Sequence, residues 1–232
     1  MAKKLTYFTP QTFRFLRSLA KNNNREWFQA HKTEFEEHLR NPYQRLIVDL
    51  AEPLRKISPH FVADPRPVGG SMFRIHRDTR FAKDKSPYKT FAGAQFFHAR
   101  RRELLGDAPL FYLHIAPGEC FLGGGIWHPQ PEALRRVRAY LLGNPASWKK
   151  ITRGAAFQKM FKLGGESLTR PPAGFDPAHE LIDDLKRKDF VCSTNFDERQ
   201  ACAPGFLKFL VERYKLLAPL NDWLCGALDL DF

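Results

Sequence analysis

Long apolar runs are missing from this sequence of 232 residues. None approaches the roughly 18 consecutive apolar residues that a membrane-spanning helix needs. The N-terminal segment MAKKLTYFTP also lacks the apolar core of a secretory signal peptide. We therefore expect a cytoplasmic protein that does not use a membrane as its partner.

Cysteine is scarce, and its spacing argues against two common kinds of site. The four cysteines form no Cys-x-x-Cys pair, so we expect neither a cysteine zinc site nor a disulfide framework. Each cysteine lies among apolar neighbours, which is typical of a buried, unreactive thiol. The cysteines are Cys120, Cys192, Cys202 and Cys225.

Catalytic and cofactor-binding motifs are missing as well. The sequence has no serine-hydrolase elbow, zinc-protease motif, Walker A motif or dinucleotide-binding glycine motif in its required context. Gly123 to Gly125 lie inside strand-like sequence, where they indicate a bulge or a close backbone approach. The eight histidines are dispersed. We expect no metal and no cofactor, and the sequence leaves open whether the protein is an enzyme.

Positive charge is what the sequence has in excess. Lysine and arginine number 37 against 25 acidic residues, which gives a formal net charge of +12. Such a balance favours an anionic partner, whether a nucleic acid, a phosphorylated small molecule or an acidic protein. Hydrophobic residues make up 43% of the chain, and this share excludes a disordered protein.

The pattern of apolar residues predicts a single α+β domain over residues 1–232. We expect a mainly antiparallel sheet from the middle of the chain, flanked by N-terminal and C-terminal helices. The expected regions are helical 9–58, strand-rich 71–128 and helical 131–230, with one further strand near 189–195.

Within the strand-rich region, four segments alternate in the way that half-buried strands do. They are 71–77, 90–99, 110–117 and 119–128. The last two flank a Pro-Gly turn and are predicted to form an antiparallel hairpin. Further along, residues 157–163 are predicted to be helical.

Prolines and asparagines locate the expected helix boundaries. Pro42, Pro177 and Pro219 are each predicted to begin a new helix, because the first turn of a helix does not need the proline N–H. Asn23, followed three residues later by Glu26, resembles a capping box for the second helix.

Residues 74–90, RIHRDTRFAKDKSPYKT, form the one stretch that looks like a site. If its first half is a strand, then Arg74, His76 and Arg80 share one face with Asp78. Guanidinium groups in such a row can bind carboxylate or phosphate oxygens through paired hydrogen bonds, and an acid among them can orient them. The candidate anion-binding residues are Arg74, Arg77, Asp78, Arg80, Lys83, Lys85, Tyr88 and Lys89.

Four other residues are candidates for an accessory role. Asn23, Arg25 and Trp27 lie at the start of a predicted helix, where polar groups can meet an anion. The alternative for these three is a helix cap beside a core tryptophan. His76 with Asp78 is a candidate for a base and its partner beside a bound anion.

Three functions remain open at this point. The leading hypothesis is a pocket for a phosphorylated or carboxylated small molecule, with or without turnover. The second is a nucleic-acid-binding module that also uses the basic patch Arg100 to Arg102, and its binding would weaken steeply with salt. The third is an interaction protein in which the charges form structural salt bridges. Phe81 and Tyr88 lie among the charges, which indicates that the loop packs against the protein.

Two segments resemble the hallmark segments of the family called domain of unknown function 2461. They are FLRSLAKNNNREWF (15–28) and FRIHRDTRFAKDKSPYKT (73–90). The resemblance extends over nearly the whole chain and implies one domain, but it implies no activity because the family is uncharacterised. Ala82 stands where the resemblance implies serine in many members, which argues against a nucleophile there. The hallmark positions are Asn23, Arg25, Trp27, Arg74, Arg77, Asp78, Arg80, Lys83, Lys85, Pro87, Tyr88 and Lys89.

Overall fold

Six strands form one antiparallel sheet in the computed structural model, which describes residues 6–104 and 106–232. The strand order is β1-β2-β3-β4-β6-β5, and every neighbouring pair is antiparallel. The expected α+β fold, the hairpin and the further strand near 189–195 are confirmed. The strands are β1 (Phe61–Val62), β2 (Ala92–His98), β3 (Leu110–Ile115), β4 (Cys120–Ile126), β5 (Lys162–Gly164) and β6 (Phe190–Phe196).

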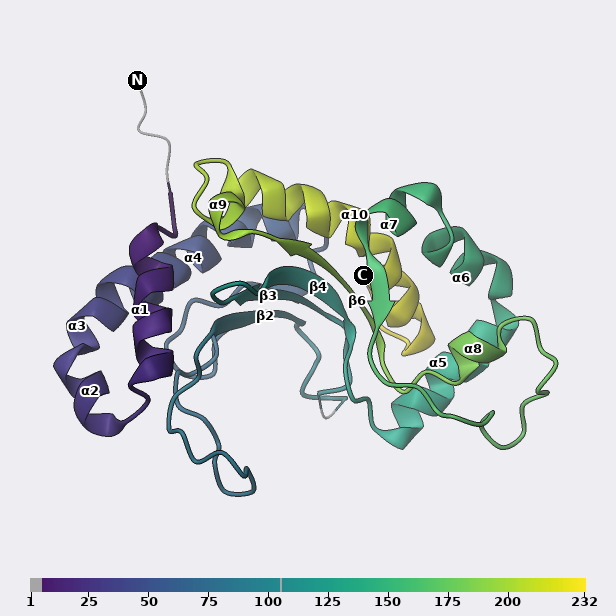
Figure 1. Cartoon of the computed structure of the whole chain (residues 1–232). Helices are drawn as coiled ribbons and strands as arrows, with labels where there is room; N and C mark the ends of the chain where they lie inside the picture. The colour runs from purple at the N-terminus through teal and green to yellow at the C-terminus, as the bar shows by residue number, and fades with distance from the viewer. Residues whose placement is uncertain (1–5, 105) are drawn as a thin grey trace.

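The sheet curls into an arch, with helices at both of its ends and along its outer side (Figure 1). Helices α1 to α4 lie at one end, α5 to α8 lie at the other, and α10 follows the outer side. The helices are α1 (Pro10–Lys21), α2 (Arg25–Ala30), α3 (Lys32–Phe35), the π-helix η1 (Glu36–Arg40), α4 (Asn41–Arg55), α5 (Pro131–Gly143), α6 (Pro145–Thr152), α7 (Ala155–Met160), α8 (Ile182–Leu185), α9 (Glu198–Ala201) and α10 (Phe206–Ala227).

In the described part of the chain, no helix is both long and apolar enough to span a bilayer. Residues 1–5, on which the expectation about a signal peptide partly rests, lie outside that part.

Helix α10 packs closely against the outer side of the sheet. The Tyr214 ring lies 5.0 Å from the ring of Phe111 and 5.9 Å from that of Phe96. Gly124 of β4 lies beneath the helix, where an added Cβ would be only 2.8 Å from the Leu217 side chain. The glycines of β4 therefore lie at a close approach of helix and strand, which is one of the two interpretations that the sequence allowed.

Pro219 lies inside a continuous helix, and the prediction that it begins a new helix is wrong. Pro42 lies in the first turn of α4, as predicted, but no cap separates α4 from η1. Asn41, just before Pro42, has helical φ and ψ angles of −63° and −44°, so η1 continues directly into α4. Pro219 lies within α10, which replaces two predicted helices. The apolar face continues across this proline, because Leu217 and Leu220 are both fully buried. Burial of that face maintains the helix despite the missing backbone hydrogen bond.

Pro42 leaves the carbonyl group of His38 without its usual helical donor, because proline has no N–H. Thr12 of α1 supplies a donor instead, and its Oγ1 lies 2.7 Å from the His38 carbonyl oxygen. The same Oγ1 accepts a hydrogen bond of 3.2 Å from the backbone N–H of Thr9. Thr12 is buried, so no bulk water reaches it to replace these bonds. A hydroxyl from a second helix therefore compensates for the proline.

Two other predicted elements differ from the structure. The predicted helix at 157–163 is divided between α7 and β5, because the edge of β6 offers backbone groups with which β5 pairs. Pro177 does not begin a helix. The side chain of Asp176 instead accepts from the N–H of Ala178 at 2.8 Å, which forms a turn, and only the short α8 follows.

Replacing Thr12 with valine tests this account of Pro42. Valine keeps the shape but removes the donor, so the partly buried His38 carbonyl loses its partner and the free energy of unfolding should fall by about 1–3 kcal/mol. Urea denaturation measures the change, and Thr33→Val at an exposed position is the control. In a Pro42→Ala background, where residue 42 regains an N–H, Thr12→Val should cost clearly less. Equal costs in both backgrounds would contradict the proposed link.

Candidate functional site

Residues 74–90, here called the cationic loop, leave the edge of the sheet and project from the molecule (Figure 1). The first half is not the regular strand that was predicted, since an isolated bridge joins His76 to Tyr88. The Pro87 carbonyl accepts a backbone hydrogen bond of 2.9 Å from Arg77. Because Pro87 has no N–H to return that bond, the ladder ends there.

The base of the cationic loop is anchored, and its tip extends into solvent. Tyr88 is 2% exposed, and its ring stacks on that of Phe28 in α2 at 4.1 Å. Asn23 binds the backbone of Tyr88 twice: Nδ2 donates to the carbonyl at 2.9 Å, and Oδ1 accepts from the N–H at 3.1 Å. Phe81 is 95% exposed, so the expectation that both aromatic residues pack against the protein is wrong for Phe81.

The capping residue of α2 is Asn24, one position after the predicted Asn23. Its Oδ1 accepts from the N–H of Trp27 at 2.9 Å, which leaves Asn23 to bind Tyr88. Trp27 is partly buried and packs against the hydrophobic core. The Arg25 side chain makes no hydrogen bond or ion pair within the described residues. Of these three accessory candidates, only Asn23 contacts the cationic loop through hydrogen bonds.

Two arginines of the cationic loop are paired with its own acids. Arg80 donates to the carboxylate of Asp78 at 3.0 Å through Nε and at 2.7 Å through Nη2, and this pairing lowers the pKa of Asp78. Arg77 pairs with Asp84. The pKa of Asp84 is lowered first by hydrogen bonds from Ser86 and then by Arg77. Such exposed pairs contribute little stability, but they occupy the guanidinium groups.

Backbone carbonyls hold two of the lysines. Lys89 Nζ lies 2.6 Å from the carbonyl oxygen of Arg74 and 2.8 Å from that of His76. Burial lowers the pKa of Lys89, and the two nearby arginines lower it further. Lys85 Nζ lies 2.9 Å from a carbonyl within the loop. Among the predicted cations of this loop, Arg74 and Lys83 have side chains with no hydrogen bond or ion pair to any described residue.

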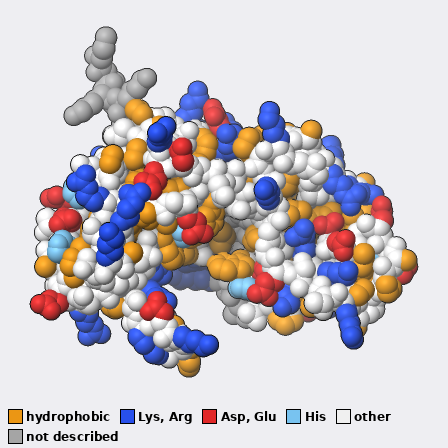
Figure 2. Space-filling model, in the orientation of Figure 1, with side chains coloured by type: hydrophobic (Ala, Val, Ile, Leu, Met, Phe, Trp, Pro, Cys, Tyr) orange, Lys and Arg blue, Asp and Glu red, His pale blue; other side chains and the backbone are white. Residues whose placement is uncertain are grey.

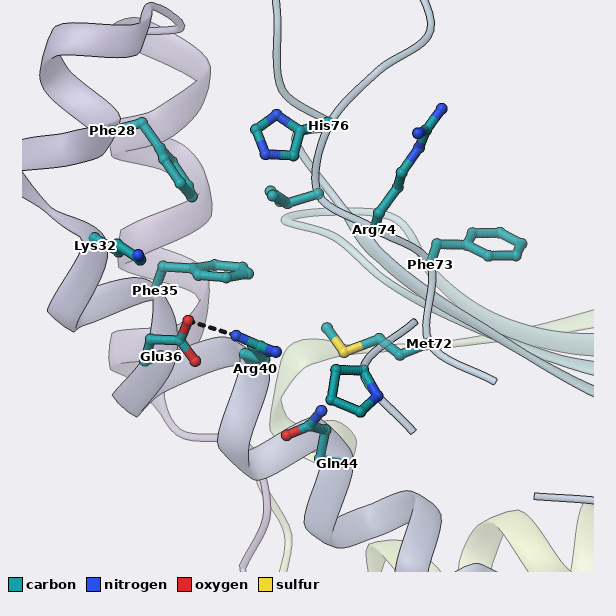
Figure 3. Close-up of a pocket in the computed structure, with 12 residues that line it drawn as sticks. Phe28, Lys32, Phe35, Glu36, Arg40, Gln44, Met72, Phe73, Arg74 and His76 are labelled. Carbon is teal, nitrogen blue, oxygen red and sulfur yellow. Dashed lines mark hydrogen bonds and ion pairs between the residues drawn. The ribbon is translucent and has the colours of Figure 1, made fainter. Parts of the chain in front are cut away.

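A pocket of about 220 Å³ lies between the N-terminal helices and the start of the cationic loop (Figure 3). One wall is a row of residues spaced four apart from Phe28 to Gln44. Along an α-helix a spacing of four drifts by about 40° per step, and the wider π-helical turn of η1 offsets this drift. The lining residues are Phe28, Lys32, Phe35, Glu36, Arg40, Gln44, Pro67, Met72, Phe73, Arg74, Ile75 and His76.

The charged lining of this pocket is mostly basic. Arg40 Nη1 lies 2.7 Å from Glu36 Oε1, a pair that Figure 3 shows on the helical wall. Lys32 has no ion pair among the described residues, and Arg74 lies on the opposite wall with its guanidinium directed away from the Glu36–Arg40 pair (Figure 3). The lining thus has three permanent cations against one carboxylate. The apolar part of the lining is formed mainly by Phe28, Phe35, Met72 and Ile75.

The pocket includes two of the residues predicted from the sequence, Arg74 and His76. Asp78 bonds to Arg80, and no hydrogen bond or ion pair joins it to His76 in the described residues. The remaining predicted residues lie outside the lining: Arg77, Asp78, Arg80, Lys83, Lys85, Tyr88, Lys89, Asn23, Arg25 and Trp27. Sequence reasoning missed the helical wall, Lys32, Glu36, Arg40 and Gln44, whose only signal is their regular spacing of four.

Comparison with known proteins shows the family of this chain. A family model described as "Conserved hypothetical protein (DUF2461)" matches residues 11–223. The chain therefore belongs to the DUF2461 family, and the match includes both walls of the pocket and the whole cationic loop. No curated protein and no solved structure matches the chain.

Replacing Asn23 with alanine should release the base of the cationic loop. Two hydrogen bonds to Tyr88 are lost, so the free energy of unfolding should fall by roughly 2 kcal/mol. Trypsin should then cut more quickly within residues 74–89, because proteolysis follows local opening. Mass spectrometry of timed digests measures this. Asn22→Ala, which removes one exposed bond to Ser18, is the matched control. Unchanged cleavage in Asn23→Ala would mean that other contacts hold the loop.

Proposed function

We propose that this protein binds a small anionic molecule with an apolar part in the pocket between η1 and residues 72–76. The observation that carries the proposal is the composition of the lining. Three permanent cations and an imidazole belong to the same lining as an apolar patch, and the one carboxylate is already paired with Arg40. A ligand with one carboxylate or phosphate beside a hydrophobic group matches both parts of this lining.

The size of the pocket limits the ligand. Pockets for drug-sized molecules have volumes of about 300–1,000 Å³, and this one has about 220 Å³. A single ring or a short chain with one anionic group fits such a volume, whereas a nucleotide does not. We therefore expect a monoanion or a simple phosphate ester.

The chemistry of the lining favours binding over covalent turnover. The lining contains no serine, threonine, cysteine or aspartate. Its side chains of the kind used as general acids or bases are Glu36 and His76, and Glu36 already accepts from Arg40. Lys32 and Arg74 can donate to an anion without giving up a partner. The protein is therefore proposed as a binding protein whose ligand need not react.

The ion pairs in the cationic loop support a structural role for its tip, in contrast to the ligand-binding role proposed for the pocket. Arg77 and Arg80 are each paired with an aspartate of the same loop. These pairs fit the hypothesis that part of the charge braces the loop. The proposed ligand site is therefore confined to the loop's first residues, Arg74 to His76.

Phenyl phosphate is a suitable probe, because it joins one ring to one phosphate. It should bind the wild-type protein and raise the melting temperature in proportion to its concentration. Arg74→Ala removes a charge-assisted hydrogen bond, worth about 1.5–3 kcal/mol, and should weaken binding by about 10-fold to 100-fold. Isothermal titration calorimetry measures the dissociation constant.

Arg80→Ala is the matched control, since it removes an arginine of the same loop outside the pocket. It should leave the dissociation constant unchanged. Lys32→Ala should weaken binding from the opposite wall. If Arg80→Ala reduces the affinity and Arg74→Ala does not, the anion binds at the loop tip and the pocket proposal is wrong.

A further inference from the structure

The side of the sheet opposite α10, here called the inner face, presents aligned side chains from successive strands. One cross-strand row contains, in order, Gln95, Tyr112, Gly123, Ser193 and Lys162. A second row contains Gly93, His114, Phe121 and Asn195, and a third contains Phe97, Leu110, Gly125, Val191 and Gly164.

These residues face away from α10 because side chains alternate along a strand. Phe96 and Phe111 contact Tyr214 of α10, so Phe97 and Tyr112 point to the other side. In Figure 2 a hollow with hydrophobic side chains in its walls opens at the centre of the molecule, between the two groups of helices of Figure 1.

Aromatic rings cluster on the inner face. His114 lies between the rings of Phe91 and Phe121, at 4.5 Å and 4.6 Å and nearly parallel to both. Tyr112 lies 5.6 Å from Phe121 and 5.9 Å from Phe73, and its hydroxyl is 3.0 Å from His114 Nδ1. Burial raises the pKa of Tyr112 to about 12, so its hydroxyl keeps its proton at neutral pH. Apart from His114, these rings are partly exposed.

Cations lie at opposite ends of this aromatic surface. The Arg101 guanidinium lies 3.6 Å from the centre of the Phe97 ring, which brings the basic patch of residues 100–102 to the edge of the inner face. Lys162 of β5 is exposed at the far end of the row that contains Tyr112. The acid that acts on Tyr112 and His114 is Glu119, and Asp64 acts on Arg101.

Hydrogen-bonding side chains lie among the rings. Gln95, Ser193 and Asn195 are all at least partly exposed, and their side chains have no hydrogen-bond partner among residues 6–104 and 106–232. Amide and hydroxyl groups in such positions can bind sugar hydroxyls or base edges.

We infer that the inner face binds single-stranded RNA. Bases stack on the rings of Phe121 and its neighbours, phosphates contact Arg101 and Lys162, and the free amides meet the 2′-hydroxyl groups. A duplex would leave the rings without partners, because its bases are already stacked on one another. This site lies apart from the small-molecule pocket, and neither proposal depends on the other.

The decisive experiment compares oligomers of equal phosphate number by fluorescence anisotropy at several salt concentrations. The probes are fluorescein-labelled U12, an abasic ribose 12-mer, dU12 and an RNA duplex. We expect U12 to bind at least tenfold more tightly than the abasic oligomer, because stacking is lost without bases. We also expect U12 to bind more tightly than dU12 and the duplex. This comparison uses the wild-type protein alone, so it does not depend on a variant folding.

Variants then locate the site. Phe121→Leu should weaken U12 binding about fivefold or more, and Arg101→Ala should reduce the salt slope by about 0.7. Arg213→Ala is the matched control, because this arginine also lies over a phenylalanine ring, that of Phe209, but on α10. It should change neither quantity.

Three results would overturn the inference. Equal binding of U12 and the abasic oligomer would indicate attraction of any polyanion by the net charge. Equal binding of U12 and dU12 would remove the assignment to RNA. A loss in Arg213→Ala as large as that in Arg101→Ala would move the site off the inner face. Saturating phenyl phosphate should not displace U12, and this control separates a failure here from a failure of the pocket proposal.

Discussion

The close approach of α10 to β4 is the constraint on which the arrangement of the molecule depends. Gly124 has no side chain, so Leu217 can settle against the strand and the long helix can cover one side of the arch. Tyr214 and its neighbours then bury the outer residues of β2 and β3. Because the apolar side chains on that side of the sheet are buried by α10, the other side can carry polar and aromatic groups. A one-sided core thus leaves the inner face for the RNA binding that we infer.

The N-terminal helices form one wall of the pocket through a regular spacing of residues. Their successive four-residue steps bring Lys32, Glu36 and Arg40 into line, although they come from an α-helix and a π-helix. The same helices hold the cationic loop through Asn23 and the Phe28–Tyr88 stack. The pocket is therefore assembled from one rigid wall and one loop that the rigid wall fixes in place. The anion binding that we propose uses Lys32 from one wall and Arg74 from the other.

Turn and boundary residues in the sequence predicted those helices and strands whose ends depend on neighbouring residues alone. The β3–β4 hairpin, for example, has a Pro-Gly turn between its strands. Pro219 misled because burial of Leu217 and Leu220 on either side of it outweighs the local preference of proline. The continuity of η1 with α4 at Pro42 was not visible either, since the replacement donor comes from another helix. The loop charges were visible, but pairing of Arg77 and Arg80 with aspartates depends on side-chain geometry, as does the helical wall facing Arg74. No sequence pattern measures such distances.

The π-helix η1 links the pocket to the core in a way that separates the two when the chain changes length. Each residue of an α-helix turns the chain by about 100°, and each residue of the wider π-helix turns it by less. Deleting one residue from Glu36–Arg40 would convert the π-turn into ordinary α-helix, and α4 would keep nearly its present orientation. Tyr43, Leu46 and Leu50, all fully buried, would therefore stay in the core. The spacing of four between the pocket residues would be lost, so a deletion in this turn changes the pocket wall and leaves the core in register.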